Sequence, residues 1–432
     1  MKYCARCLYP ENAKPTIIID DEDGICSGCK YNESRQKLEV NWDERKQMFG
    51  EIMEEAKKMA EERGNQYDCI IPVSGGKDSH FQVYVVKEIY GLNPLLVTYN
   101  HIFNHQAGLR NLENLVEKSG CDLIRFTANP HSVKKLSRFM LETVGDLTWH
   151  YHAGIRTLPF KVAVEKNIPL IIWGEHGFAE LTGIVSLEDF VEFTRWNRKE
   201  HDMRGFEPED VVKKSNGLIS MKDLDPYIFP SDEALEKTEV RGIYMSNFFD
   251  WNAKKAVERM MKIWDFKPIS YERDRTFVQY AKIDDHANDI HDYLKFLKFG
   301  YGRATDDASM EIRHGRMTRE EGIRMVERYD SNTPKSLKPY LEFMELTEEE
   351  FYKLVEPMRD PLIWEKHNGK WQMKDSVKNH LSNEFTEAAK VPQVEDRTFS
   401  EENKHLYFNP ENTPEKLGDD RLDIPNNMFK IL

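Results

Sequence analysis

The residues that constrain this chain most are Ser-Gly-Gly-Lys-Asp-Ser at positions 74–79. The apolar run 67–73 before them has the composition of a strand, and residues 80–90 after them have the pattern of a helix. Glycine lacks the Cβ atom that would keep a backbone away from an anion, and the N–H groups that open the helix face the same concavity. The sequence therefore predicts a phosphate-binding loop between a strand and a helix.

The spacing of this loop separates it from the Walker type, which has a longer spacer before its Gly-Lys-Ser/Thr. It resembles instead the SGGxDS loop of the PP-loop ATP pyrophosphatases. That family cleaves ATP between the α and β phosphates, so the resemblance implies that an oxygen atom of the substrate is adenylated. A tight strand-to-helix turn without a ligand is the alternative.

Length and charge narrow the class of protein. A chain of 432 residues exceeds what one hydrophobic core usually serves, so we expect two or three domains. The net charge of −14 disfavours a large polyanion as substrate, because backbone phosphates are normally met by a basic face. No apolar run approaches the length of a membrane span, and the first residues lack the apolar core of a signal sequence. We therefore expect a cytoplasmic protein that binds no membrane, and we do not expect nucleic acid among its partners.

Four of the six cysteines fall in the first 29 residues, as two Cys-x2-Cys pairs. Each pair can lie on a tight knuckle and present two thiolates to one tetrahedral ion, which is the spacing of a zinc ribbon. Between the pairs we expect a strand at 16–20 and a hairpin turn at 21–24. Two disulfides or an iron–sulfur cluster are the alternatives, and the reducing cytosol disfavours the disulfides. Because four thiolates fill a tetrahedral ion, we predict a structural metal with the ligands Cys4, Cys7, Cys26 and Cys29.

Beyond the loop, strands and helices alternate along the chain. This order predicts a doubly wound, parallel α/β sheet, which the loop assigns by resemblance to the PP-loop ATP pyrophosphatase type. Ligands of such sheets gather beyond the carboxyl ends of the strands, which marks Asn100, His101 and residues 174–177 in addition to the loop. Strands are expected at 67–73, 94–99, 121–126 and 168–173, with helices at 42–63 and 108–119 and with Cys69 and Cys121 as core thiols.

We expect three regions: a zinc-ribbon-like module at 1–40, the ATP pyrophosphatase domain at 41–330, and a helical and extended C-terminal region at 331–432. The mixed-charge stretch 186–246 breaks the alternation and is interpreted as an insertion or a helical excursion. The polar tail from about residue 384 is expected to be extended on the surface or mobile. Further helices are expected at 253–264, 284–298, 337–344 and 347–358, the last with Thr347 as N-cap.

A basic segment stands out in this acidic chain. Residues 293–305 and 312–321 combine lysines and arginines with glycines and could wrap anionic oxygens, and a solvated helix face is the alternative. Together with the cysteine knuckles, the loop and Trp173-Gly174-Glu175 after the fourth strand, these residues resemble the N-acetyl sugar amidotransferases. The resemblance runs from Cys4 to about Glu321. These bacterial enzymes are implicated in making acetamidino sugars for lipopolysaccharide, other surface polysaccharide or flagellar glycan.

That resemblance implies an ATP-dependent reaction with the cofactors ATP, Mg²⁺ and Zn²⁺. The acetamido oxygen of an N-acetylated sugar or sugar nucleotide would be adenylated with release of pyrophosphate, and ammonia would then displace AMP. The protein must stabilise charge on the transferred phosphoryl group and on the departing pyrophosphate. The nucleotide is expected to be bound by Ser74, Gly75, Gly76, Ser79 and Asn100. Lys77 is expected to neutralise its phosphates, Asp78 to hold Mg²⁺, and Glu175 to hold a second Mg²⁺ or guide ammonia. The residues expected to close over pyrophosphate or over the sugar nucleotide's phosphates are Lys298, Arg303, Arg313 and Arg316.

The nitrogen source points to a partner. An amidotransferase fed by glutamine needs an accessible, activated cysteine nucleophile. Four cysteines are assigned to the metal, and Cys69 and Cys121 lie in predicted strands, so the glutaminase is expected to be a separate subunit. The resemblance implies a partner like the glutaminase of histidine biosynthesis. His150, His152 and His176 are expected to form hydrogen bonds rather than to act as catalysts.

Two other classes of function stay open. A tRNA-modifying sulfur or nitrogen transferase uses the same ATP loop, and the net charge and the lack of an obvious catalytic cysteine stand against it, although Cys121 keeps it open. A zinc-bearing scaffold that only binds nucleotide is the other. The products separate the three classes: AMP and pyrophosphate with a modified sugar, a modified tRNA, or no turnover.

Overall fold

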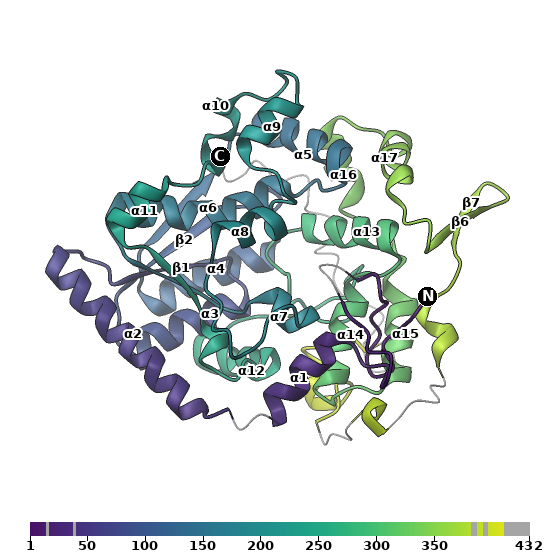
Figure 1. Ribbon diagram of the computed structural model, residues 1–432, viewed down its shortest axis with the longest axis horizontal. Coiled ribbons are helices and arrows are strands. Elements are labelled where there is room, and N and C mark those ends of the chain that lie inside the picture. Colours follow the sequence, from purple (N-terminus) through teal and green to yellow (C-terminus); the bar gives the residue numbers. More distant parts are fainter. Residues whose placement is uncertain (14–16, 38–39, 382–386, 392–395, 410–432) are drawn as a thin grey trace.

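The computed structural model describes residues 1–13, 17–37, 40–381, 387–391 and 396–409. Its centre is a five-stranded sheet in the order β3-β2-β1-β4-β5, and all neighbouring strands are parallel (Figure 1). The doubly wound parallel sheet predicted from the sequence is therefore confirmed. The strands are β1 (Cys69–Pro72), β2 (Pro94–Asn100), β3 (Leu123–Thr127), β4 (Leu170–Trp173) and β5 (Arg241–Tyr244).

Alternate residues of β1 pack on opposite faces of the sheet, because successive side chains of a strand point to opposite sides. Cys69 and Ile71 belong to the largest core cluster, which α2, α3, α4 and α12 cover. Ile70 belongs to a second cluster, formed with Phe160 and Ala163 of α6. These helices are α2 (Trp42–Arg63), α3 (Lys77–Tyr84), continued by a π-helical turn (Val85–Ile89), α4 (Gln106–Ser119), α6 (Trp149–Lys166), against which α5 (Pro130–Val144) packs, and α12 (Ala253–Trp264).

The stretch 186–246 is a helical excursion, as one of the two interpretations held, but it ends in a strand that the sequence analysis missed. β5 pairs with β4 through four residues and so extends the sheet. Before it run α8 (Arg195–Asn197), a π-helical turn (Arg198–Asp202), α9 (Pro208–Lys214), α10 (Met221–Leu224), a 3-10 turn (Asp225–Tyr227) and α11 (Asp232–Thr238).

The N-terminal residues form a small module around the four cysteines. The predicted strand at 16–20 is reduced, within the described residues, to a single antiparallel bridge between Ile19 and Cys26. Helix α1 (Ser27–Lys37) begins at the second cysteine knuckle. The module packs on α14, because Tyr9 donates a hydrogen bond to Asp306 (2.8 Å).

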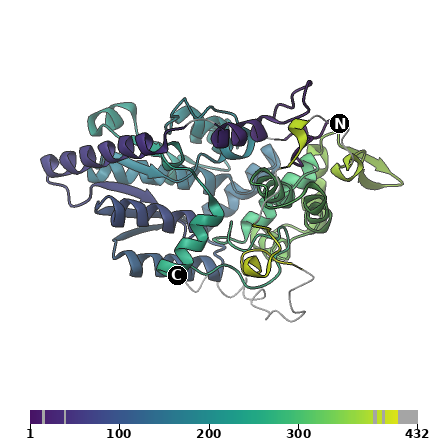
Figure 2. The ribbon, with the colours of Figure 1, turned by 90° about the horizontal axis from the view of Figure 1, so that it is seen from below.

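Helices α13 to α17 lie beside the sheet, to the right in Figures 1 and 2. Thr347 caps α17 in a capping box with Glu350, which confirms the predicted N-cap. No helix of the described residues combines the length and the apolar composition needed to cross a membrane. The elements here are α13 (Ala287–Phe299), α14 (Arg303–Arg313), α15 (Arg319–Tyr329), α16 (Leu337–Met344), α17 (Glu348–Val355), and a hairpin of β6 (Trp364–His367) and β7 (Lys370–Met373). Short 3-10 turns follow α17 and the hairpin, and much of the predicted tail lies outside the described residues.

Candidate active site

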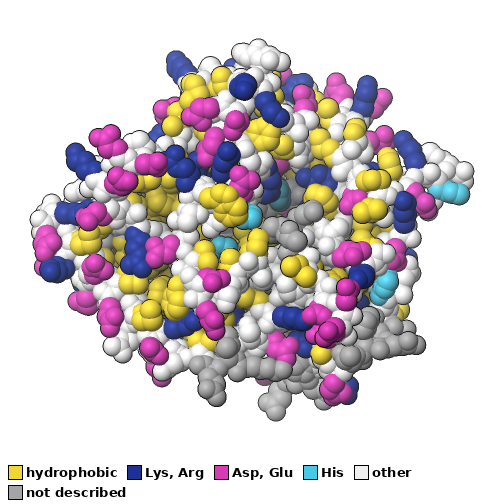
Figure 3. Space-filling model, viewed as in Figure 1, with side chains coloured by type: hydrophobic (Ala, Val, Ile, Leu, Met, Phe, Trp, Pro, Cys, Tyr) yellow, Lys and Arg dark blue, Asp and Glu magenta, His cyan; other side chains and the backbone are white. Residues whose placement is uncertain are grey.

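A cavity of about 1120 Å³ opens at the carboxyl ends of the strands. Its walls come from the loop after β1, from the segment after β4 with α7 (Gly177–Thr182), and from α13 and α14. In Figure 3 histidine side chains gather around a hollow near the middle of this face. Sites for one small ligand usually measure roughly 300–1,000 Å³, so this cavity has room for two.

The predicted phosphate loop lies in this cavity. Helix α3 begins at Lys77, directly after the double glycine, so its first N–H groups and the positive end of its dipole face the cavity. Gly75 has φ +83°, and a Cβ atom there would lie 2.5 Å from the carbonyl oxygen of Gly108 and 2.8 Å from the backbone nitrogen of Leu112. Only glycine therefore fits where the loop packs on α4. The loop is braced by the Ser74 N–H, which donates to the hydroxyl of Ser79 (3.0 Å).

Two carboxylates and a lysine converge beside the loop. Lys77 Nζ lies 2.5 Å from one oxygen of Asp78, and the other oxygen of Asp78 is buried without a hydrogen-bond partner in the described residues. Glu175 follows β4, the neighbour of β1, and its side chain faces the cavity. Enclosure by the protein raises the pKa of Glu175 to about 7, and the charge of Asp78 adds to the effect. Burial opposes the charge of Lys77, but both carboxylates outweigh it and raise its pKa.

This donor set fits a divalent cation with the phosphates of ATP. A divalent cation would give the unpartnered carboxylate oxygen a partner and would lower the raised pKa of the second carboxylate, and carboxylate and phosphate oxygens can bind such an ion together. Asp78 and Glu175 are the residues that would hold Mg²⁺. The ion would neutralise charge on the phosphates.

Two lysines stand apart from the other cations of the cavity. Lys282 and Lys298 have no ion pair with a carboxylate of the described residues, whereas every other lining lysine or arginine has one. Lys298 Nζ donates to the carbonyl of Gly145 (2.9 Å), and burial lowers the pKa of Lys298 to about 8. Enclosure and the charge of Arg303 lower the pKa of Lys282. The two side chains are therefore the cations left free to receive an anion.

The arginines of the basic segment are already paired. Arg303 donates to both oxygens of Asp292 (2.8 and 3.1 Å) and also pairs with Asp306 (3.3 Å). Arg316 is held by both oxygens of Glu311. Both arginines line the cavity and contribute to its electrostatic potential. Because carboxylates already accept from them, they have fewer N–H groups to donate to a ligand.

One end of the cavity is built around a buried carboxylate, Asp146. It accepts from Arg204 Nε (3.1 Å), and His291 and His152 lie 3.6 and 3.8 Å from its oxygens. Lys298 belongs to this end as well, because the charged groups that act on it are Asp146 and Arg204. We call Asp146, His152, Arg204, His291 and Lys298 the basic end.

Three further residues that the sequence singles out form hydrogen bonds within the protein. Asn100 lies at the end of β2, where its amide donates to Thr127 (2.9 Å) and accepts from Arg125 (2.8 Å), and it does not line the cavity. His150 contacts the hydroxyl of Tyr99 (3.3 Å). His176 accepts from the N–H of Ala179 and caps α7, so both histidines form hydrogen bonds as expected.

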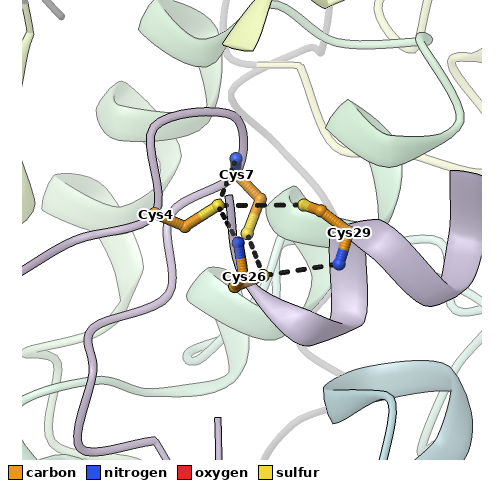
Figure 4. A group of neighbouring side chains, drawn as sticks. All are labelled: Cys4, Cys7, Cys26 and Cys29. Carbon is orange, nitrogen blue, oxygen red and sulfur yellow. Dashed lines mark hydrogen bonds between the residues drawn. The ribbon is translucent and has the colours of Figure 1, made fainter. Parts of the chain in front are cut away.

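The four N-terminal cysteines form one cluster, shown in Figure 4. Their sulfur atoms lie within 4.8 Å of one another, with Cys4–Cys29 at 3.9 Å and Cys7–Cys26 at 3.6 Å. A tetrahedral ion with Zn–S bonds of ~2.3 Å places its sulfurs about 3.8 Å apart, whereas a disulfide needs ~2.05 Å. The cluster therefore fits a metal ion and not two disulfides. Cys69 and Cys121 are free and buried in the core, as expected.

Arg313 does not face the cavity, where the sequence analysis placed it as a candidate for phosphates. Its guanidinium points at the cysteine sulfurs instead. The spacing of the basic segment gave no sign of this, because the cysteines lie at the other end of the chain. Lys282, conversely, lines the cavity and was missed.

Comparison with known proteins agrees with the expected family. Residues 274–378 match the family described as "LPS biosynthesis protein WbpG-like, C-terminal domain". The curated Uncharacterized protein MJ1599 of Methanocaldococcus jannaschii is 29% identical over 121 residues, which cover 28% of this chain and 41% of that protein. The matched part of the chain thus spans about two fifths of that relative's length.

Two solved structures share weaker likeness. The NH3-dependent NAD synthetase from Campylobacter jejuni, in complex with the nitrate ion, has a TM-score of 0.25 and 12% identity over 54% of this chain and 100% of that one. The NMN synthetase from Francisella tularensis has a TM-score of 0.25 and 14% identity over 52% and 87%. Neither likeness decides an activity. The residues that match the WbpG-like family model include Lys282, Lys298 and Arg303 of the cavity.

Proposed function

We propose that the protein is an ATP-using, AMP-forming amidotransferase of lipopolysaccharide biosynthesis. It would convert the acetamido group of an N-acetylated sugar, probed first as a nucleotide-linked sugar, into an acetamidino group. The observation that carries the proposal is the phosphate loop beside the unpartnered oxygen of Asp78, in a cavity with room for a second ligand. The lipopolysaccharide assignment is supported by the match at 274–378.

The chemistry follows from what the residues can stabilise. The acetamido oxygen attacks the α-phosphorus of ATP, an O–P bond forms, and the bond to pyrophosphate breaks. Ammonia then attacks the imidoyl carbon, a C–N bond forms, the C–O bond to AMP breaks, and a proton is released. The loop N–H groups and Lys77 would hold the phosphates, and Lys282 would meet negative charge that develops on the leaving pyrophosphate.

The second substrate is assigned to the basic end. Lys298 and Arg204 lie there together, in a neighbourhood of Asp146 rather than of the loop carboxylates. A cation without a carboxylate partner favours a ligand that carries its own anionic group. The acceptor would thus place its acetamido group toward the loop and its anion toward Lys298.

Product analysis tests the function. The protein is incubated with Mg·ATP, ammonium and a set of nucleotide-linked N-acetyl sugars, and nucleotides and sugars are analysed by mass spectrometry. AMP, pyrophosphate and a sugar lighter by the exchange of O for NH support the proposal. ADP as product, or AMP formation that requires bulk tRNA and yields a modified tRNA, contradicts it.

The pH dependence of acceptor binding tests the role of Lys298. The pKa of Lys298, about 8, means that it is charged at pH 7 and loses its charge as the pH rises through 8. The charged fraction of such a group falls about thirtyfold between pH 7 and pH 9.5, so we expect the KM for the acceptor to rise over this range by up to about thirtyfold. Lys298→Arg stays charged in this range and should flatten the profile. A wild-type KM that is constant over this range contradicts the assignment.

The nitrogen source gives a further prediction. Two described cysteines lie outside the metal cluster, Cys69 and Cys121, and both are buried. Burial raises the pKa of the Cys69 thiol well above its usual range. Such thiols make poor nucleophiles. We expect the isolated chain to use ammonium but not glutamine, and to gain glutamine use with a separate glutaminase subunit resembling that of histidine biosynthesis. Efficient glutamine hydrolysis by the purified chain alone would contradict this.

A further inference from the structure

One side chain joins the cysteine cluster to the wall of the cavity. Arg313 is the last residue of α14, the helix that also lines the cavity. Its Nε donates to the sulfur of Cys29 (3.4 Å), and its Nη2 donates to the sulfurs of Cys26 (3.5 Å) and Cys7 (3.8 Å). The guanidinium is buried, so these sulfurs and the charge of Arg313 face each other away from water.

The same guanidinium holds the end of α7. Its Nη1 donates to the carbonyl oxygens of Glu180 (3.0 Å) and Leu181 (2.9 Å). These are among the last carbonyls of α7, which have no partner within the helix and lie at the negative end of its dipole. A guanidinium carries five N–H donors, and the sulfurs and carbonyls supply an acceptor for each. Helix α7 follows Glu175 closely in the chain and lines the cavity, whereas Arg313 does not line it. Arg313 therefore holds α7 from the side that faces away from the cavity.

Close packing fixes this link in one arrangement. A Cβ atom on Gly28 would lie 2.4 Å from Arg313 Nη2 and 2.5 Å from the carbonyl oxygen of Leu181. Gly183, with φ +66°, would place a Cβ atom 2.5 Å from the carbonyl oxygen of Ser27. The Ser27 hydroxyl donates to the last carbonyl of α7 (2.6 Å). The second cysteine knuckle and the end of α7 therefore cannot shift independently.

We propose that Arg313 is a positioning residue that couples the metal centre to the nucleotide site. The metal gathers the four sulfurs into the arrangement that receives the guanidinium, and the guanidinium holds α7 and α14 at the cavity. Four thiolates around a divalent ion keep a net negative charge, which the buried arginine offsets. The inference rests on the proposed function in one respect, that the loop binds ATP. Loss of the metal is then expected to weaken ATP binding, although none of the four cysteines lines the cavity.

The test uses the full-length holoprotein with Arg313→Lys, and Arg6→Lys as a matched control. Arg6 lies within the first cysteine knuckle, but its side chain donates to Glu33 and to the carbonyl of Ala388, and it has no hydrogen bond to a sulfur atom of the described residues. Three quantities are measured: the thiolate-to-cobalt absorption of Co²⁺-loaded protein, the rate of zinc loss to a chelator, and the affinity for Mg·ATP without acceptor.

For Arg313→Lys we expect a shifted cobalt absorption, because a single ammonium cannot replace three N–H···S contacts. Zinc should be lost to the chelator ~10- to 100-fold faster, in line with the loss of metal affinity when residues that support metal ligands are replaced. Affinity for Mg·ATP should fall about fivefold or more. Arg6→Lys should match the wild type in all three. Wild-type protein stripped of zinc should lose ATP affinity to a similar degree and recover it when zinc is returned.

Two results would overturn the coupling. One is a cobalt absorption unchanged by Arg313→Lys; the other is faster metal loss with unchanged ATP affinity. Neither result contradicts the proposed function if the wild-type holoprotein still binds ATP and forms AMP. A wild-type holoprotein that binds no ATP removes both proposals.

Discussion

Asp78→Asn is expected to reduce AMP formation by a factor of ~100 or more, because it removes a carboxylate that holds the metal ion against the phosphates. One oxygen of Asp78 is engaged by Lys77 and the other is buried without a partner in the described residues, so the structure leaves that second oxygen for a ligand. Asparagine keeps the shape of the side chain but loses its charge. Pyrophosphate release from ATP, measured with saturating ammonium and acceptor, is the readout.

The matched control is Asp265→Asn. Asp265 lies at the C-terminal end of α12 with φ 54°, a conformation that asparagine also accepts, and it does not line the cavity. This variant should form AMP at the wild-type rate. Pyrophosphate release by Asp78→Asn at the wild-type rate would contradict the assignment of the loop.

Cys29→Ser is expected to release one zinc ion per chain and to destabilise the protein by several kcal/mol. Structural zinc contributes folding free energy to the module that binds it, and here the substitution also removes one of the three sulfur atoms to which the buried Arg313 donates. Metal content by elemental analysis and the midpoint of denaturant unfolding are the measurements.

Cys121→Ser is the control for this change, because Cys121 is also buried but lies outside the cluster. It should keep its metal. Protein purified without air that contains iron, or no metal, would contradict the zinc assignment. Full metal content in Cys29→Ser would contradict the cluster itself.

Local patterns predicted most of the fold. Helices α2, α12 and α16 have the bounds that their apolar periodicity and flanking residues predicted, because both signals lie within each segment. The helix after the loop begins three residues earlier than expected, at Lys77. β5 was missed because four residues in a charged stretch become a strand only through pairing with β4, which lies some 70 residues earlier.

The site divides in the same way. The loop at 74–79 could be predicted because strand, glycines and helix are contiguous. Lys282 could not, because it lies in a segment without regular structure and is distinguished only by having no ion pair with a carboxylate in the part of the chain that the structure describes. The role of Arg313 depends on sulfurs about 300 positions earlier, which no local pattern reveals.

The distance along the chain between Arg313 and the cysteines also has a consequence for biosynthesis. The sulfur of Cys29 and its arginine are separated by 284 residues. At ~5–20 residues per second, the ribosome makes the arginine roughly 15–60 s after the second knuckle. The cysteine thiols of the nascent chain are therefore exposed to metal ions and oxidants before the helices that later enclose them are synthesised. Scarcity of the metal in the cell would then act on the growing chain, and a finished, folded molecule would be much less sensitive to it.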